Sequence, residues 1–152
     1  MNRVPHALQG ALESDCGHSL ESIIESGRPE DFEALLEVVQ HPADSEELLK
    51  ALHLLGRWGD PRAVAPIKKL LPQLPEIERA RAMDALGRIG GTEALKAVLD
   101  YEKDSSPQVR KFVAYALSRM EQPEARRALK RLRETDPVDF VRKVAGQRLS
   151  GE

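Results

Sequence analysis

The chain contains a single cysteine, Cys16, so no disulfide bond can form within it. Such a chain fits a reducing compartment, because secreted domains of this size often depend on disulfides. Residues 1–10 lack the continuous apolar run of a signal peptide. No stretch approaches the ~18 consecutive apolar residues that a membrane span needs. We therefore expect a cytoplasmic protein that does not enter a membrane.

Aromatic residues are also scarce. They make up 4% of the 152 residues, whereas 41% are hydrophobic and 32% are charged, which favours a helical protein over a β-sandwich. The length corresponds to one domain with a core of its own. The net charge is only −2, but residues 1–47 hold 11 acidic and 2 basic side chains, and residues 48–152 hold 14 acidic and 21 basic ones. This asymmetry predicts an acidic end and a more basic remainder of the surface.

The sequence shows no pattern typical of catalysis or of metal binding. Cys16 and His18 lie two residues apart, but a nucleophilic pair needs an orienting third group and an oxyanion site, and neither is visible. His6, His41 and His53 have no ligand spacing and no carboxylate cluster beside them. We therefore predict no catalytic residue, no metal site and no cofactor.

What the sequence does contain is a repeat with a period of 31 residues. Residues 82–95 read AMDALGRIGGTEAL, and the stretches 31 positions earlier and later read ALHLLGRWGDPRAV and VAYALSRMEQPEAR. A period of this length indicates structural units that stack on their neighbours rather than one globular core.

The sequence of each unit predicts two helices joined by a polar loop that contains proline. The first helices begin at Pro29, Pro61, Thr92 and Pro123, and proline suits the first turn because its missing N–H has no partner there. The second helices span roughly 45–58, 76–90, 107–120 and 138–149. Three of them repeat an apolar quartet with the i, i+3, i+4, i+7 spacing of one buried helix face. The quartets are Ala51, Leu54, Leu55, Trp58; Ala82, Ala85, Leu86, Ile89; and Val113, Ala116, Leu117, Met120.

The residues ahead of the repeats predict a capping helix at the N-terminal end. Leu20, Ile23 and Ile24 indicate one amphipathic helix ahead of the repeats. We therefore divide the chain into an acidic lead-in with a capping helix, residues 1–27, and a repeat domain, residues 28–152. The predicted fold is an all-α, short α-solenoid of about four helix pairs with an N-terminal capping helix.

Two positions predict how the units pack. Gly56 and Gly87 recur late in the second helices, where a missing side chain lets a neighbouring helix approach closely. In the last unit, Arg126 takes the position that Leu95 holds one period earlier. A charged residue on that face is expected for the end of a solenoid, which no further repeat covers.

The stretch LGRWGDPRAV at 55–64, with Val-Arg at 109–110 and at 141–142, resembles HEAT-like repeats, in particular the subgroup found in phycobilisome lyases. In that family an Asp of the inter-helix loop and an Arg of the second helix form a ladder between neighbouring repeats. The resemblance implies ladder positions at Asp104 with Arg110 and at Asp136 with Arg142. Members of the HEAT-like repeat family include chromophore lyases, DNA-repair glycosylases and, most often, protein-binding scaffolds. The fold alone therefore does not specify a function.

Two repeats depart from the ladder motif. Arg79 matches its Arg, but Gln73 stands where the Asp would be, and the first repeat has Leu48 at the Arg position. We therefore expect the ladder to fail at the first repeat, and Asp44 to make no contact equivalent to those of Asp104 and Asp136.

The second helices carry another stripe opposite the buried quartets, and the resemblance implies that this stripe lines a concave surface. It comprises Lys50, His53 and Arg57; Arg81, Asp84 and Arg88; Phe112, Tyr115 and Arg119; then Val144 and Gln147. Arg and Tyr are common among the residues that dominate protein interfaces. We predict that the stripe from Lys50 to Arg119 binds a partner; the alternative is an ordinary solvated helix face.

The predicted function is a non-catalytic scaffold or adaptor whose concave face holds a protein partner with an acidic surface. One alternative is a lyase-like protein that handles a chromophore or another small molecule in the same groove. Another is nucleic-acid binding, which the negative net charge disfavours. The candidate residues for nucleic-acid binding form a basic run near the C-terminus, and this run would equally serve as the polar end of the solenoid. The run comprises Arg126, Arg127, Lys130, Arg131 and Arg133.

Overall fold

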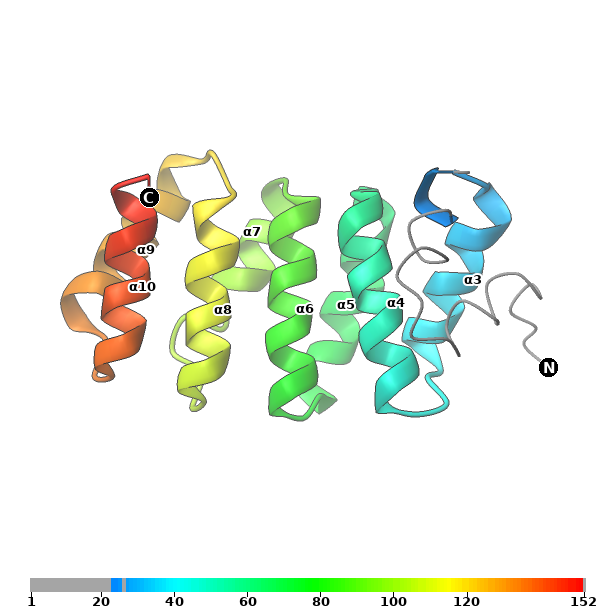
Figure 1. The fold of residues 1–152 in the computed structure, drawn as a ribbon, viewed down its shortest axis with the longest axis horizontal. Helices are drawn as coiled ribbons and strands as arrows, with labels where there is room; N and C mark the ends of the chain where they lie inside the picture. Colours follow the sequence, from blue (N-terminus) through cyan, green and yellow to red (C-terminus); the bar gives the residue numbers. More distant parts are fainter. Residues whose placement is uncertain (1–22, 26, 152) are drawn as a thin grey trace.

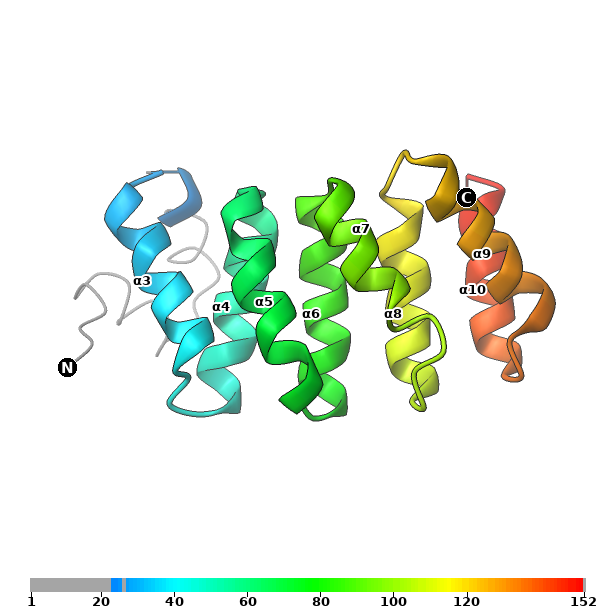
Figure 2. The same cartoon turned by 180° about the vertical axis from the view of Figure 1, so that it is seen from behind.

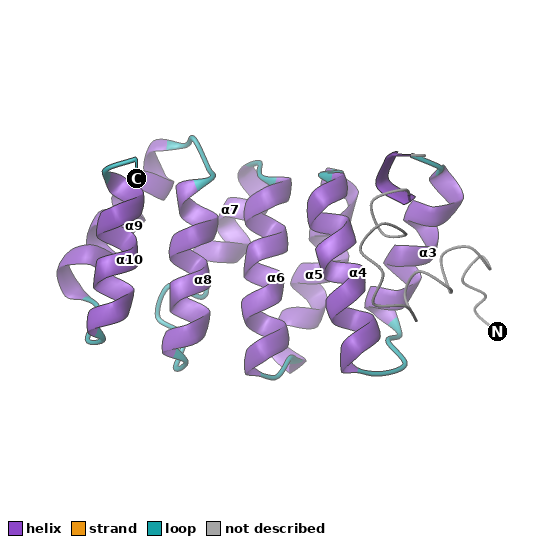
Figure 3. Cartoon of the chain, in the orientation of Figure 1, coloured by secondary structure: helices purple, strands orange, loops and turns teal. Residues whose placement is uncertain are grey.

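The structure is a computed structural model, and it describes residues 23–25 and 27–151. Within these ranges the chain forms four helix pairs and no strand, and the pairs stand side by side in two layers (Figures 1 and 3). The prediction of a short all-α solenoid is confirmed. None of the described helices is both long enough and apolar enough to cross a membrane.

One layer holds the first helix of each pair and the other layer holds the second. The first helices are α3 (Pro29–Gln40), α5 (Val64–Leu70), α7 (Thr92–Leu99) and α9 (Pro123–Thr135), seen in front in Figure 2. The second helices are α4 (Ser45–Trp58), α6 (Glu76–Ile89), α8 (Pro107–Ser118) and α10 (Asp139–Leu149), seen in front in Figure 1. Two 3-10 turns, η1 (Pro61–Ala63) and η2 (Leu71–Gln73), flank α5.

The helix ends follow from local sequence chemistry. Asp44 precedes α4, and its carboxylate accepts a hydrogen bond from the Glu47 N–H at 2.8 Å. Ser106 precedes α8 in the same way, with its hydroxyl accepting from the Val109 N–H at 3.3 Å. These side chains satisfy backbone donors that have no partner inside the helix. Gly59 ends α4 with a φ of 74°, a conformation that glycine adopts without strain.

The predicted apolar quartets form the centre of the core. Leu54, Leu55, Leu86 and Leu117 are fully buried. The fourth quartet position differs between units: Met120 is buried, whereas Trp58 and Ile89 are partly buried. Trp58 packs against Phe32 of α3 with ring centroids 5.5 Å apart, so its role is packing between the layers.

The two ends of the solenoid differ. Residues 23–25 are helical and Ile23 is buried against the core, as predicted for the capping helix. Residues 1–22 and 26 of that lead-in, which include His6, Cys16, His18 and Leu20, lie outside the described residues. At the other end Arg126 is exposed, whereas Leu95 is buried at the same position of the preceding unit.

Gly56 and Gly87 bring the second helices close together, as predicted. A Cβ atom built on Gly56 would lie 3.0 Å from the Ala85 Cα of α6, and one built on Gly87 would lie 2.5 Å from the Ala116 Cα of α8. The second helices pack closely on one another, whereas successive first helices make few mutual contacts. This close packing places the stripes of successive second helices side by side on one face of the solenoid.

Gly87→Ala is expected to destabilise the protein by about 1–2 kcal/mol, since the strain of inserting a methyl group into a packed interface outweighs the gain in helix propensity. Gly146→Ala in α10 is the matched control. Its new Cβ would meet only the flexible Arg133 side chain, at 3.6 Å, so propensity alone should stabilise that variant by up to roughly 1 kcal/mol. Chemical denaturation measures both changes, and equal effects would contradict the close approach of α6 and α8.

Candidate functional site

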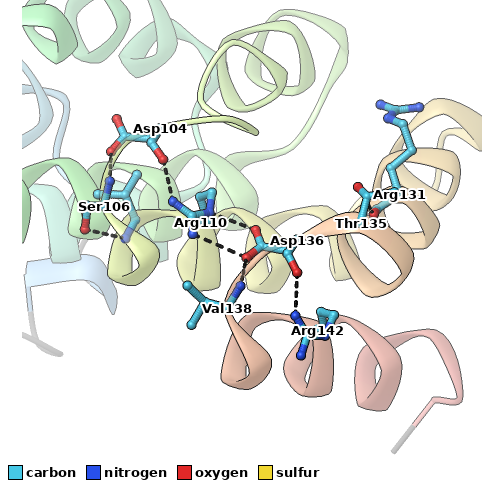
Figure 4. A network of polar contacts seen from close by, with 9 residues as sticks. Asp104, Ser106, Arg110, Arg131, Thr135, Asp136, Val138 and Arg142 are labelled. Carbon is cyan, nitrogen blue, oxygen red and sulfur yellow. Dashed lines mark hydrogen bonds and ion pairs between the residues drawn. The ribbon is translucent and has the colours of Figure 1, made fainter.

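A ladder of buried charges holds successive second helices in place (Figure 4). The Arg110 guanidinium donates two hydrogen bonds to the Asp136 carboxylate, at 2.8 and 3.3 Å, and a third to the Asp104 carbonyl at 2.7 Å. Arg79 donates to the Asp104 carboxylate at 3.1 Å and to the Leu74 carbonyl at 2.9 Å. The ladder between repeats is present: Arg79 and Arg110 each pair with the carboxylate of the following repeat and with a backbone carbonyl of their own repeat. Arg142 of the last unit instead donates to the Asp136 carbonyl at 2.7 Å and to the Asp139 carboxylate at 3.3 Å.

The ladder also shapes the loops before the helices. The Asp104 carboxylate accepts from the Ser106 N–H, and the Asp136 carboxylate accepts from the Val138 N–H, both at 2.9 Å. Burial raises the pKa of Tyr101, and the neighbouring Asp104 carboxylate raises it further. These hydrogen bonds fix the conformation of the loops at the starts of α8 and α10.

Between the first two pairs the ladder fails, as expected from Leu48. The Ser45 hydroxyl bonds instead to the Glu78 carboxylate of α6. As expected, Asp44 makes no ladder contact. It has a different role that the sequence did not predict, because it is the N-cap of α4. Asp44 lies next to the helix, whereas Asp104 precedes α8 by three residues.

The predicted stripe follows the second helices and lines three open depressions. The first, of about 440 Å³, is lined by Gly56, Arg57, Gly87, Arg88 and Arg119. The second, of about 310 Å³, is lined by Leu49, Lys50, His53, Arg81 and Asp84. The third, of about 200 Å³, is lined by Glu76, Ile77, Ala80, Arg81, Gln108 and Phe112. Eight of the nine predicted residues therefore meet in these depressions, and Tyr115 lies beside Phe112.

The first depression, which we call the arginine depression, gathers one Arg from each of three successive helix pairs: Arg57 of α4, Arg88 of α6 and Arg119, which follows α8 directly. Gly56 and Gly87 leave its floor free of side chains. The Asp84 carboxylate lies 3.1 Å from the Arg88 Nε and holds that side chain along α6. Among the described residues, no acidic side chain lies within ion-pair distance of the exposed Arg119. The depression therefore presents more positive than negative charge.

Phe112 and Tyr115 of the stripe are half-buried. The two rings meet edge to face with centroids 5.6 Å apart. Arg81 lies over the Phe112 ring at 5.5 Å, and Arg148 of α10 lies over the Tyr115 ring at 4.7 Å. Cation–π contacts of this kind hold the guanidinium groups beside the rings.

The stripe predicted from the sequence omits two residues of this face, Ile77 and Arg148. Ile77 lies one helical turn before Arg81, so extending the stripe by four residues would have found it. Arg148 was missed because α10 was expected to continue the stripe through Val144 and Gln147. Val144 packs partly against the core instead.

In the part of the chain that the structure describes, no three His, Cys, Asp or Glu side chains are placed to hold a metal ion. The basic run on α9 is exposed, and two of its members are in ion pairs: Arg131 with Glu102 at 2.8 Å and Arg133 with Glu134 at 3.2 Å.

Comparison with known protein families agrees with this geometry. The family model for HEAT repeats matches residues 67–150, which is more than half of the chain. This chain belongs to the HEAT repeat family. No curated protein sequence matches it. As in other HEAT repeat proteins, each unit here is a helix pair, and solenoids of such units are typical of protein-binding scaffolds.

Solved structures with a similar fold include designed armadillo repeat proteins. One, in complex with the peptide (KR)4, is 18% identical, covers 94% of this chain and 79% of its own, and superposes with a TM-score of 0.61. Another, computationally designed for modular peptide recognition, has the same identity and coverage and a TM-score of 0.62. At this identity the likeness establishes the solenoid fold alone.

Proposed function

We propose that this HEAT repeat protein is a non-catalytic scaffold that binds an acidic segment of a partner protein on its second-helix face. The observation that carries the proposal is the arginine depression, in which Arg57, Arg88 and Arg119 come from three successive helix pairs. Arg is favoured at such sites because its planar fork binds carboxylates through two parallel hydrogen bonds.

The position of these residues has a second physical explanation. A basic side chain near the end of a helix interacts favourably with the negative end of the helix dipole, and Arg57 and Arg88 lie in the last turns of α4 and α6. That effect accounts for a base at each helix end. It does not require three guanidinium groups to line one depression with a glycine floor, and we take this convergence as the sign of a ligand.

The charge of the face indicates the charge of the partner. The similar designed protein binds the basic peptide (KR)4, whereas the second-helix face of this chain carries arginines. A partner of opposite sign is then favoured, because complementary charge accelerates encounter and disfavours wrong partners. The resemblance to the phycobilisome-lyase subgroup supports the alternative, which is a small molecule held in the same depressions.

The test compares two triple charge reversals of equal size. Arg57→Glu/Arg88→Glu/Arg119→Glu should weaken binding of a fluorescent deca-glutamate peptide by about 10- to 100-fold, because three exposed charge contacts contribute roughly 0.5–1 kcal/mol each. Arg126→Glu/Arg127→Glu/Lys130→Glu on the outer face of α9 is the control and should change binding by less than about threefold. Fluorescence anisotropy gives both dissociation constants.

Co-purification from native extract extends the test to the natural partner. The wild type and the α9 control should recover the same protein, and the arginine-depression variant should lose it. Equal recovery by both variants would contradict the proposal, and loss only in the α9 control would move the site to the outer face. Recovery of a bound small molecule in place of a protein would favour the lyase-like alternative.

A further inference from the structure

An apolar depression lies at the other end of the same face, between the first turns of α6 and α8. Ile77, Ala80 and Phe112 form its apolar part. Ile77 is 64% exposed and, with Phe140, is one of two large hydrophobic side chains that the described residues expose. A single exposed apolar residue is ordinary. Here, however, Ile77 shares a depression with an aromatic ring of the neighbouring helix.

Helix formation does not explain this isoleucine. A β-branched side chain loses rotamer freedom in a helix, and Ile77 makes no compensating burial. Ala80 follows one turn later and is buried, so the floor of the depression is close to the backbone of α6. A small residue beside two large apolar ones forms a recess that an incoming side chain can fill.

Three cations lie beside the aromatic rings at this recess, and Arg81 also lines it. Arg81 lies 5.5 Å and Lys111 5.4 Å from the centroid of the Phe112 ring, and Arg148 lies over the adjoining Tyr115. None of the three is in an ion pair with another described residue. The carboxylate of the rim, Glu76, accepts a hydrogen bond from the Ser106 hydroxyl at 2.8 Å. An apolar centre with a charged rim is the usual anatomy of a binding interface.

We propose that this recess, the apolar depression, binds one apolar side chain of the acidic partner segment. The inference rests on the function proposed above and adds a sequence requirement: an aliphatic or aromatic residue flanked by carboxylates. The carboxylates face Arg81, Lys111 and Arg148, and the apolar side chain contacts Ile77 and Phe112.

The size and place of the recess favour a peptide over a small molecule. Its volume of about 200 Å³ is below the roughly 300–1,000 Å³ of small-molecule pockets, and it fits a single side chain. Ile77 and Arg88 are eleven residues apart on α6, a separation of roughly 16 Å along a helix. An extended peptide spans that distance in about five residues. The apolar residue should therefore bind best about five residues from the acidic group in the arginine depression.

The experiment is a positional scan with the full chain. The probes are fluorescent twelve-residue peptides of Glu and Ser in which one Leu is moved through each position, with the Leu-free peptide as reference. The best Leu position should bind the wild type about tenfold more tightly than the reference, as expected for partial burial of a leucine side chain. Ile77→Ser should abolish this preference and leave the affinity for the reference peptide unchanged.

The controls separate the two proposals. Phe140→Ser removes the other exposed hydrophobic side chain, which lies outside the recess, and should preserve the Leu preference. No Leu preference in the wild type, or a preference that survives Ile77→Ser, overturns the apolar subsite and leaves the acidic-partner proposal intact. Failure of every acidic peptide to bind overturns both proposals. Equal binding of a Leu-containing peptide with Asn in place of Glu overturns the acidic requirement.

Discussion

Leu86→Asp should unfold the protein or leave it only marginally stable. Leu86 is fully buried in α6 and lies in the core shared with α4 and α8. An aspartate there would be an unpaired charge without water, and a large apolar side chain would also be lost. The expected loss of unfolding free energy is at least about 5 kcal/mol, comparable with the ~5–15 kcal/mol total of a typical domain.

Ile77→Asp is the matched control, since it makes the same type of change in the same helix at a position that is 64% exposed. Its effect should stay within roughly 0.5 kcal/mol, because an acidic side chain is favourable in the first turn of a helix. Far-ultraviolet circular dichroism and thermal melting compare the two variants. If Leu86→Asp melts like the wild type, the stacking of α6 between its neighbours is wrong.

Asp136→Ala should have the second largest effect, a loss of about 3–5 kcal/mol. The side chains of Asp136 and Arg110 are only 2% and 9% exposed, and their closest atoms are 2.8 Å apart. Removing the carboxylate leaves a buried guanidinium without its partner and takes the acceptor from the Val138 N–H. Urea denaturation measures the change in unfolding free energy.

Alanine variants of three other aspartates should lose less unfolding free energy than Asp136→Ala. Asp104→Ala should be milder than Asp136→Ala, because Asp104 and Arg79 are 10% and 21% exposed. Asp44→Ala should lose about 1 kcal/mol, the usual value of an N-cap. Asp139 is exposed; a hydrogen bond from Lys143 lowers its pKa. Its replacement by alanine should change stability little, because solvent screens an exposed ion pair. Equal losses at all four positions would contradict the ladder.

Replacing both partners of the buried pair tests its physical origin. Arg110→Met/Asp136→Leu removes the two charges together, so no buried charge is left without a partner. The double variant should recover at least half of the stability lost in Asp136→Ala. A double variant as unstable as Asp136→Ala would show that the backbone hydrogen bonds of these two residues matter more than the ion pair.

The helix pairs and their buried faces could be predicted from the sequence, because both depend on local geometry. A helix places residues i, i+3, i+4 and i+7 on one side whatever surrounds it. The quartet that contains Leu86 was therefore identifiable as core. Gly87 was identifiable as a contact point for a similar reason, since its repetition one period after Gly56 marks a place where helices meet.

The contacts between helices were decided only by the tertiary structure. Arg79 reaches Asp104, 25 residues away, because stacking brings the loop before α8 next to α6. The grouping of Arg57, Arg88 and Arg119 likewise depends on how closely the glycines let the helices approach. Periodicity specifies the direction of a side chain around its own helix. It does not specify the distance and the tilt between helices, and these determine that Ile77 shares a recess with Phe112 and that Arg148 covers Tyr115.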